Sequence, residues 1–229
     1  SGPWDDAVAY RVGVVSERES VAADSLGDRV LAVVDEESEL TYLETDRPEV
    51  SGSTTVDLPD GADGELLADR VFLWDPPTEL YERGFYGQRL DDQDGDVLQL
   101  SLLEAASLAR KGAVAIDGGA DAVVERGREV EGERFDRRLS VYERLRERGV
   151  VPKTGFKFGA DFRTYADVES VDDLGHSERL VRVLAADHAF EPRDLALDVR
   201  LAHGVRKEMV FALTDGDGVE WLSVGRLTP

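Results

Sequence analysis

Residues 152–165 read PKTGFKFGADFRTY, and this stretch is more informative about the fold and the chemistry than any other part of the chain. It places two lysines and an arginine around two glycines and four aromatic residues. The aromatic residues Phe156, Phe158, Phe162 and Tyr165 recur at nearly alternate positions. Alternation of this kind predicts a β-strand with one face packed against a core.

Further along the chain, two more polar residues stand near predicted strands. His176 lies in GHSERLVRVL, eleven residues after Tyr165, and Lys207 lies in VRLAHGVRKEMVFA, thirty-one residues after His176. Residues 177–185 read as a strand, and residues 192–205 read as a helix with Pro192 in its first turn. We therefore expect residues 132–229 to form a mixed sheet flanked by helices.

The C-terminal hairpin pattern also occurs near the start of the chain. Residues 30–47 (VLAVVDEESELTYLETDR) match residues 210–226 (VFALTDGDGVEWLSVGR) as strand, acidic turn and second strand, with Ala32 matching Ala212 and Tyr42 matching Trp221. Any two hairpins with acidic turns share some of this likeness. We nevertheless interpret residues 1–48 as the C-terminal part of a degenerate repeat, one piece of a longer fused protein. In this alignment Gly27 takes the place of Lys207.

The middle of the chain reads as a linker followed by a small domain. Residues 49–64 are rich in Gly, Ser, Asp and Pro, which indicates a linker, and residues 65–131 read as a small α/β domain. Its expected elements are a strand at 70–74, helical turns at 77–84, an amphipathic helix at 98–112, a strand at 113–117 and a helix at 120–130. A charged helix is expected at 133–148. The predicted fold class is mixed α+β, with a catalytic domain at 132–229.

The composition excludes several kinds of site and indicates a saline environment. The chain has no cysteine, so disulfides and thiolate metal ligands are excluded, and we expect neither a metal nor another cofactor. Its net charge is -22, yet only four of its 27 basic residues are lysines. Such acidic, lysine-poor chains are typical of halophilic archaea, where the Debye length falls to about 3 Å in molar salt. No apolar run is long enough to span a membrane, so we expect a cytoplasmic protein.

Residues 65–229 resemble the archaeal tRNA-splicing endonucleases, in the form that fuses a degenerate repeat to an active one. The resemblance depends on LQLSLLEAASLARKG, KTGFKFGADFRTY, GHSERLV and VRLAHGVRKEMVFA. It implies a restriction-endonuclease-like C-terminal domain and a homodimer. It also implies cleavage of precursor tRNA at bulge–helix–bulge junctions, with Tyr165, His176 and Lys207 as the catalytic residues.

These residue types suit a transesterification that uses no metal. A base must take the proton of a ribose 2′-hydroxyl, an acid must protonate the departing 5′-oxygen, and a cation must stabilise the phosphorane. Histidine suits the acid and lysine suits the cation, whereas Tyr165 is assigned as the base by the resemblance alone. The expected products carry 2′,3′-cyclic phosphate and 5′-hydroxyl ends.

The resemblance also suggests which residues bind RNA and which bind a partner. Arg200 and Arg226 are the expected pair that holds an unpaired base, because arginine planes stack on splayed RNA bases. Lys153, Lys157 and Arg163 are candidate phosphate contacts, although solvated strand-edge residues have the same pattern. The acidic turns at 35–39 and 214–218 are expected either to be solvated tips or, as the resemblance implies, to join two subunits.

Two other functions compete with this interpretation. A non-catalytic RNA-binding or scaffold subunit of a tRNA-splicing complex would account for the repeat and the acidic turns. A metal-dependent DNA nuclease is disfavoured, because no acidic residue is followed by the Glu-x-Lys pattern that such enzymes use.

Overall fold

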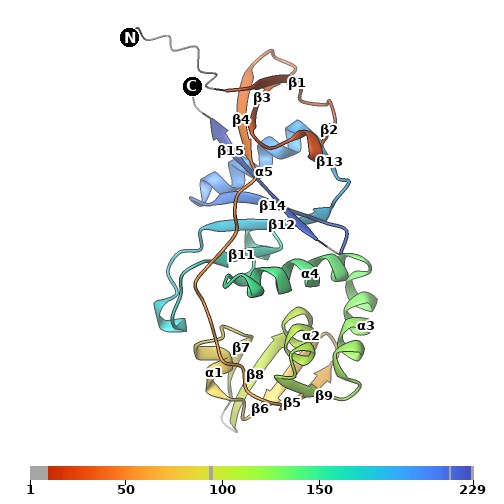
Figure 1. Cartoon of the computed structure of the whole chain (residues 1–229), viewed down its shortest axis with the longest axis vertical. Coiled ribbons are helices and arrows are strands. Elements are labelled where there is room, and N and C mark those ends of the chain that lie inside the picture. The colour runs from red at the N-terminus through yellow and green to blue at the C-terminus, as the bar shows by residue number, and fades with distance from the viewer. Residues whose placement is uncertain (1–9, 93–94, 217, 228–229) are drawn as a thin grey trace.

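The computed structural model describes residues 10–92, 95–216 and 218–227 of the 229-residue chain. A five-stranded sheet lies at one end of the molecule and an eight-stranded sheet at the other, with helix α4 (Arg134–Glu147) between them (Figure 1). The architecture is mixed α+β, as the sequence predicts. Within the described ranges, no helix is long and apolar enough to cross a membrane.

The eight-stranded sheet is mixed and runs in the order β1-β3-β4-β15-β14-β12-β11-β10. Two of its neighbouring pairs, β1 with β3 and β12 with β14, are parallel, and the other pairs are antiparallel. The strands are β1 (Val12–Ser16), β3 (Arg29–Val34), β4 (Leu40–Asp46), β10 (Val151–Thr154), β11 (Phe162–Tyr165), β12 (Arg179–Ala185), β14 (Glu208–Thr214) and β15 (Val219–Leu227).

Helices cover the two faces of this sheet in its C-terminal half. On one face, Phe162, Val181 and Val210 are buried in a core that also contains residues of α4. On the other face, Leu180 and Met209 are buried with residues of α5 (Pro192–Gly204). Successive residues of a strand point to opposite faces, so this division separates the side chains of β11, β12 and β14 into two sets.

The two hairpins that resemble each other in sequence also share one register. Ala32 lies opposite Tyr42 in the β3–β4 hairpin, and Ala212 lies opposite Trp221 in the β14–β15 hairpin. The hairpins join through β4 and β15, where Thr45 lies opposite Val224. On either side of it, Glu44 lies opposite Gly225 and Asp46 lies opposite Ser223. Because the sequence alignment matches Glu44 with Ser223 and Asp46 with Gly225, each of these pairs is the counterpart of the other. A local two-fold axis therefore passes through the Thr45–Val224 pair.

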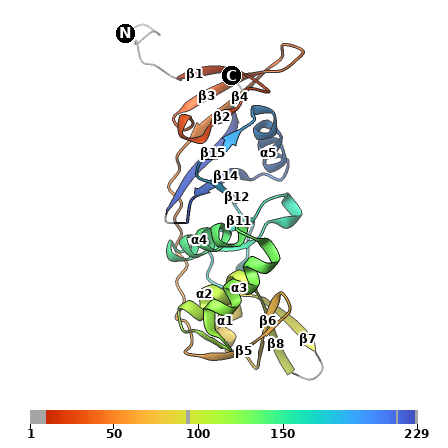
Figure 2. The same cartoon turned by 90° about the vertical axis from the view of Figure 1, so that its right-hand side faces the viewer.

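The two halves around this axis differ in one large element. The second half inserts α5 between β13 (Ala189–Phe190) and β14, whereas the first half has only the short helix η1 (Ala23–Ser25) between β2 (Val21–Ala22) and β3. Strands β2 and β13 pair with each other beside the main sheet (Figure 1), and α5 lies alongside β14 and β15 (Figure 2). The first half has thus lost the helix that leads to the position of Lys207.

The five-stranded sheet forms the other end of the molecule and runs in the order β7-β8-β6-β5-β9. Its strands are β5 (Ala62–Leu67), β6 (Arg70–Trp74), β7 (Gln88–Asp92), β8 (Gly95–Ser101) and β9 (Val114–Ile116). Its helices are α1 (Thr78–Glu82), α2 (Leu102–Arg110) and α3 (Gly119–Glu131).

The helix expected at 98–112 begins later than the sequence interpretation placed it. Residues 98–101 are the end of β8, and α2 starts at Leu102. The reason is a capping box, in which the Ser101 hydroxyl accepts a hydrogen bond from Glu104 N at 3.3 Å and the Glu104 carboxylate accepts one from Ser101 N at 2.9 Å.

The strand expected across residues 156–165 is interrupted. Phe156–Phe158 form the short 3₁₀ helix η2, and only Phe162–Tyr165 form a strand. Gly155 and Gly159 allow this turn, because Gly159 has φ 68° and a Cβ on Gly155 would lie 2.9 Å from the Ala160 carbonyl oxygen. The result is a fixed turn that leaves Phe156 exposed and packs Phe158 against the sheet.

The segment expected to be a linker at 49–64 is packed onto the protein. Val50 is buried, Gly52 N donates to the Arg148 carbonyl at 2.9 Å and Ser53 N donates to the Ala166 carbonyl at 2.8 Å. Strand β5 begins at residue 62, inside the expected linker. Composition alone indicated a loop here, and hydrogen bonds to the C-terminal part hold that loop in place.

Candidate active site

One edge of the eight-stranded sheet brings together the three residues that the sequence singles out. Tyr165 is the last residue of β11, His176 precedes β12 by three residues, and Lys207 immediately precedes β14. Strand β11 is antiparallel to β12, and β14 is parallel to it, with Arg179 opposite Glu208. The end of β11 and the starts of β12 and β14 therefore lie at the same edge.

Lys207 is held in place by the segment that contains His176. Its ammonium donates a short hydrogen bond to the carbonyl oxygen of Ser177, the neighbour of His176. The Nζ atom also lies 5.8 Å from the centre of the Phe158 ring, and this cation–π contact stabilises the position of the ammonium group. Burial, and secondly the positive charge of Arg163, lower the pKa of the Lys207 ammonium. The lysine is thus oriented and electrostatically perturbed.

Tyr165 lies in a small apolar cluster, with 6% of its surface exposed. Its buried partners are Phe85 of the N-terminal part and Val151 and Val168. The guanidinium carbon of Arg163 lies 5.8 Å from the centre of the Tyr165 ring. Packing from three segments therefore fixes the phenol, and a cation lies beside it.

His176 is exposed and lies in a segment without regular secondary structure. The chain that follows it is fixed to both neighbouring strands, since Glu178 N donates to the Thr164 carbonyl and Glu208 N donates to the Glu178 carbonyl, both at 3.1 Å. These bonds hold the imidazole-bearing segment against the edge of the sheet while the ring itself stays accessible to a ligand.

Three of the four expected RNA-binding residues are exposed. Arg200 lies on α5, Lys157 lies on the η2 turn and Arg226 lies on β15. Arg226 follows Val224, which is paired with Met209 of β14, so Arg226 reaches the edge where Lys207 lies. These residues are accessible, and Arg226 shares the edge of the candidate site.

Lys153, the fourth expected RNA-binding residue, points toward the N-terminal part of the protein. Its ammonium donates to the Gly87 carbonyl at 3.2 Å and lies 3.7 Å from the Glu104 carboxylate. Burial lowers the pKa of Lys153, against the opposing influence of Glu104. In this structure Lys153 connects the two parts of the molecule.

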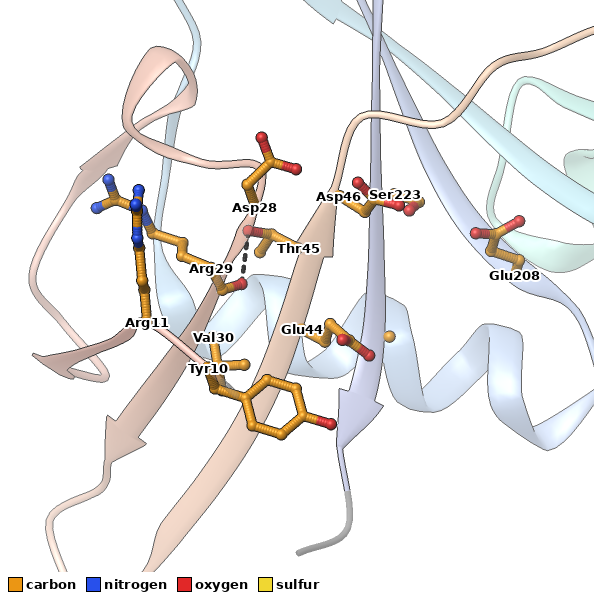
Figure 3. A pocket seen from close by; sticks show the side chains of 11 residues that line it. Tyr10, Arg11, Asp28, Arg29, Val30, Glu44, Thr45, Asp46, Glu208 and Ser223 are labelled. Atoms are coloured by element: carbon orange, nitrogen blue, oxygen red, sulfur yellow. Dashed lines mark hydrogen bonds between the residues drawn. The ribbon is translucent and has the colours of Figure 1, made fainter. Parts of the chain in front are cut away.

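A cavity of about 780 Å³ lies beside the local two-fold axis, next to the candidate site (Figure 3). Thr45 lies in its lining and donates a hydrogen bond to the Arg29 carbonyl at 3.0 Å. Two arginines line the cavity together with four carboxylates, those of Asp28, Glu44, Asp46 and Glu208. Four carboxylates against two arginines make this cavity unfavourable for an anion such as a phosphate.

The acidic turn at 35–39 has a defined structure and an exposed tip. The Asp35 carboxylate accepts hydrogen bonds from the backbone N–H groups of Glu37 and Glu39 at 2.9 and 2.8 Å. The corresponding turn at 214–218 includes Asp217, which lies outside the described residues. The first turn therefore presents a fixed cluster of carboxylates to the exterior.

The sequence interpretation missed the group that orients Lys207. That group is the carbonyl oxygen of Ser177, and a backbone acceptor leaves no signature in the choice of side chain. It also treated Arg163 as one of several equivalent cations, although the spacing of two residues from Tyr165 on a strand places both side chains on one face.

Comparisons with known proteins show which family the chain resembles. The family model described as the tRNA intron endonuclease N-terminal domain matches residues 62–126, and the catalytic C-terminal domain of that family matches residues 135–221. The chain is similar to curated proteins named tRNA-splicing endonuclease. It is 71% identical over 229 residues to that of Natronomonas pharaonis, covering 100% of this chain and 68% of the relative. It is 62% identical over 231 residues to that of Haloferax volcanii, covering 100% of this chain and 68% of the relative. It is 40% identical over 247 residues to that of Methanosarcina mazei, covering 99% of this chain and 69% of the relative.

Proposed function

The chain belongs to the tRNA intron endonuclease family and is an endoribonuclease of tRNA splicing, and we propose that Tyr165, His176 and Lys207 carry out its reaction. The observation that supports this assignment is the convergence of the three residues at one edge of the catalytic domain's sheet. The edge offers a phenol, an imidazole and an ammonium group, and the last of these is bound directly beside His176.

In the proposed reaction the 2′-oxygen of one ribose attacks the adjacent phosphorus atom. Tyr165, as the phenolate, takes the proton from that 2′-hydroxyl and becomes the neutral phenol as the new bond between oxygen and phosphorus forms. The bond between phosphorus and the 5′-oxygen then breaks, and His176 donates a proton to the departing oxygen. Lys207 stabilises the negative charge on the phosphorane. The products carry a 2′,3′-cyclic phosphate and a 5′-hydroxyl, and the three side chains supply every group that the step needs.

Recognition of the substrate is assigned to exposed arginines. We propose that Arg200 and Arg226 hold an unpaired base of a bulge–helix–bulge junction by stacking their guanidinium planes on it. Their accessibility and the position of Arg226 at the catalytic edge support this role. Lys157 is proposed as a phosphate contact on the neighbouring turn. Lys153 could join it only by giving up its contacts with Glu104 and Gly87.

We further propose that the enzyme is a cytoplasmic homodimer, joined through the acidic turns at 35–39 and 214–218. The exposed carboxylates at the tip of the first turn support a role in contact with another chain. The groove of about 460 Å³ between the two parts of the molecule is a poor receptor for such a turn, because its basic residues Arg70, Arg138 and Lys153 already lie close to carboxylates of the same chain. Sedimentation in high salt should show a dimer that Asp and Glu replacements in the 35–39 turn dissociate.

The catalytic proposal is tested by cleavage of a bulge–helix–bulge RNA in about molar potassium chloride with a chelator present. Tyr165→Phe, His176→Ala and Lys207→Ala should each slow cleavage on the order of 10²–10⁴-fold. Products with 3′-hydroxyl ends, or a requirement for Mg²⁺, would contradict the mechanism. Tight RNA binding by the unaltered protein without cleavage would instead indicate a scaffold subunit.

A further inference from the structure

Arg163 lies beside Tyr165 and close to Lys207 in the candidate active site. It is the second residue of β11, two residues before Tyr165, and is paired with Lys153 of β10 and Leu180 of β12. Residues two apart on a strand point to the same face, so Arg163 and Tyr165 share a face. Leu180 in turn is paired with Met209, which follows Lys207 by two residues on the same side of the sheet.

The guanidinium of Arg163 is not neutralised by the protein, as far as the described residues show. Its side chain is half-buried, its Nε atom is buried without a hydrogen-bond partner, and no carboxylate of the described ranges lies within ion-pair distance. Two other half-buried arginines of this sheet are paired, Arg179 with Glu208 and Arg182 with Asp198. In a chain with a net charge of -22, an arginine left unpaired beside Tyr165 and Lys207 is free to bind an anion there.

Two cations converge on the same place. The Arg163 guanidinium lies 5.8 Å from the Tyr165 ring centre. Its positive charge also contributes, after burial, to lowering the pKa of the Lys207 ammonium. Lys207 itself donates to a carbonyl oxygen rather than to a carboxylate. Like charges held together without counter-charges are typical of sites that bind a phosphate.

We propose that Arg163 is a further catalytic residue, whose guanidinium binds a non-bridging oxygen of the scissile phosphate beside Lys207. This inference depends on the proposed function of the site. Arg163 transfers no proton, because a guanidinium stays charged throughout. It shares with Lys207 the negative charge that develops on the phosphorane, and its planar fork fixes the phosphorus atom near the Tyr165 phenol.

The matched control is Arg137 on α4, which is also half-buried and forms no ion pair with a described residue. Helix α4 packs against the opposite face of the sheet, away from Tyr165 and Lys207. Arg137→Gln therefore removes the same charge from a side chain that is also half-buried, without touching the candidate site. Thermal unfolding in high potassium chloride should confirm that both Gln variants are folded.

The test measures single-turnover cleavage with enzyme in excess of RNA. Arg163→Gln should slow the chemical step on the order of 10²-fold while RNA affinity changes little, and Arg163→Lys should recover part of the rate. Arg137→Gln should cleave like the unaltered enzyme. Wild-type rates in Arg163→Gln, or equal losses in the Arg137 control, would overturn the proposal.

A second measurement separates contact with the phosphate from a structural role. RNAs are prepared with sulfur in place of either non-bridging oxygen at the cleavage site. Sulfur at the oxygen bound by Arg163 should slow the unaltered enzyme more than Arg163→Gln, because the variant has already lost that contact. Identical sulfur effects in both enzymes would refute a phosphate contact. If Tyr165→Phe and Lys207→Ala also cleave normally, the proposed function itself fails; if they lose activity and Arg163→Gln does not, only this inference fails.

Discussion

Replacing Asp161 best tests how β11, the strand that ends in Tyr165, is held in place. The side chain of Asp161 is 4% exposed and precedes β11 directly. One carboxylate oxygen accepts a hydrogen bond from Val183 N at 2.8 Å, and the other lies 2.6 Å from the Arg134 guanidinium and 2.9 Å from Nε of Arg138. The Arg138 contact is one of charge rather than an aligned hydrogen bond. Asp161 thus joins β11, β12 and α4.

The expected cost of Asp161→Asn follows from these contacts. Removing one partner of a fully buried ion pair costs about 3–5 kcal/mol. Here the cost should be about 2–3 kcal/mol, because Arg134 is 57% exposed and water screens it, while Arg138 keeps its second partner Glu131. Asp161→Ala also leaves the Val183 N–H without an acceptor, which adds about 1–3 kcal/mol.

Urea or thermal unfolding at two potassium chloride concentrations measures these differences. For a chain of this size, 1 kcal/mol corresponds to roughly 2–4 °C in Tm, so Asp161→Asn should lower Tm by roughly 4–12 °C. The loss should persist in high salt, since buried pairs are screened little. Equal losses for the Asn and Ala variants, or a loss for Asn that vanishes in high salt, would refute the reasoning.

Three further predictions concern pH, the glycine turn and the local two-fold axis. In a His176→Ala variant, which removes the other proton-carrying acid, residual cleavage should decline as pH rises through the pKa of Lys207. Burial and then Arg163 lower that pKa, so the decline should begin below the value of about 10.4 for an ordinary lysine, and a pH–rate profile of this variant that is flat to that pH would contradict the prediction. Gly155→Ala should destabilise the protein by about 1–3 kcal/mol, because the added Cβ would lie 2.9 Å from backbone atoms that cannot move aside. The control is Gly175→Ala, where the added Cβ meets open space, and this variant should unfold at the same urea concentration as the parent. Thr45→Val should lower the free energy of unfolding by about 1–3 kcal/mol, because the buried hydroxyl accepts a hydrogen bond from Gly27 N and donates one to the Arg29 carbonyl. If the variant unfolds at the same urea concentration as the parent, these two bonds contribute nothing net to stability.

Local pattern predicted much of the fold. The strand at 70–74, the helices near 120–130, 133–148 and 192–205, and both acidic hairpins are present in the structure. These elements have clear periodicity and end at glycines or acidic turns, so local preference and tertiary packing agree. The boundary at Leu102 was misplaced, because the apolar residues of β8 continue without a break into the apolar face of α2.

Features that depend on distant contacts could not be predicted in this way. The packing of residues 49–61 on the C-terminal part depends on carbonyl groups of Arg148 and Ala166, which no composition of the segment itself encodes. The joining of β4 to β15 likewise depends on two hairpins that are far apart in sequence. For the proposed site, motif order singled out Tyr165, His176 and Lys207, but the unpaired state of Arg163 appears only when the neighbouring strands are in place.

The axis through Thr45 and Val224 bears on the stoichiometry of splicing. It relates a half that carries the proposed reactive groups to a half in which Gly27 stands where the other has Lys207, so the described residues contain one proposed reactive centre. An intron has two ends, and its release needs two scissions. On the proposed assignment, release of the intron takes two chains on one transcript or two successive encounters with one chain. The proportion of singly cut RNA at limiting enzyme distinguishes a concerted pair of cuts from two independent encounters.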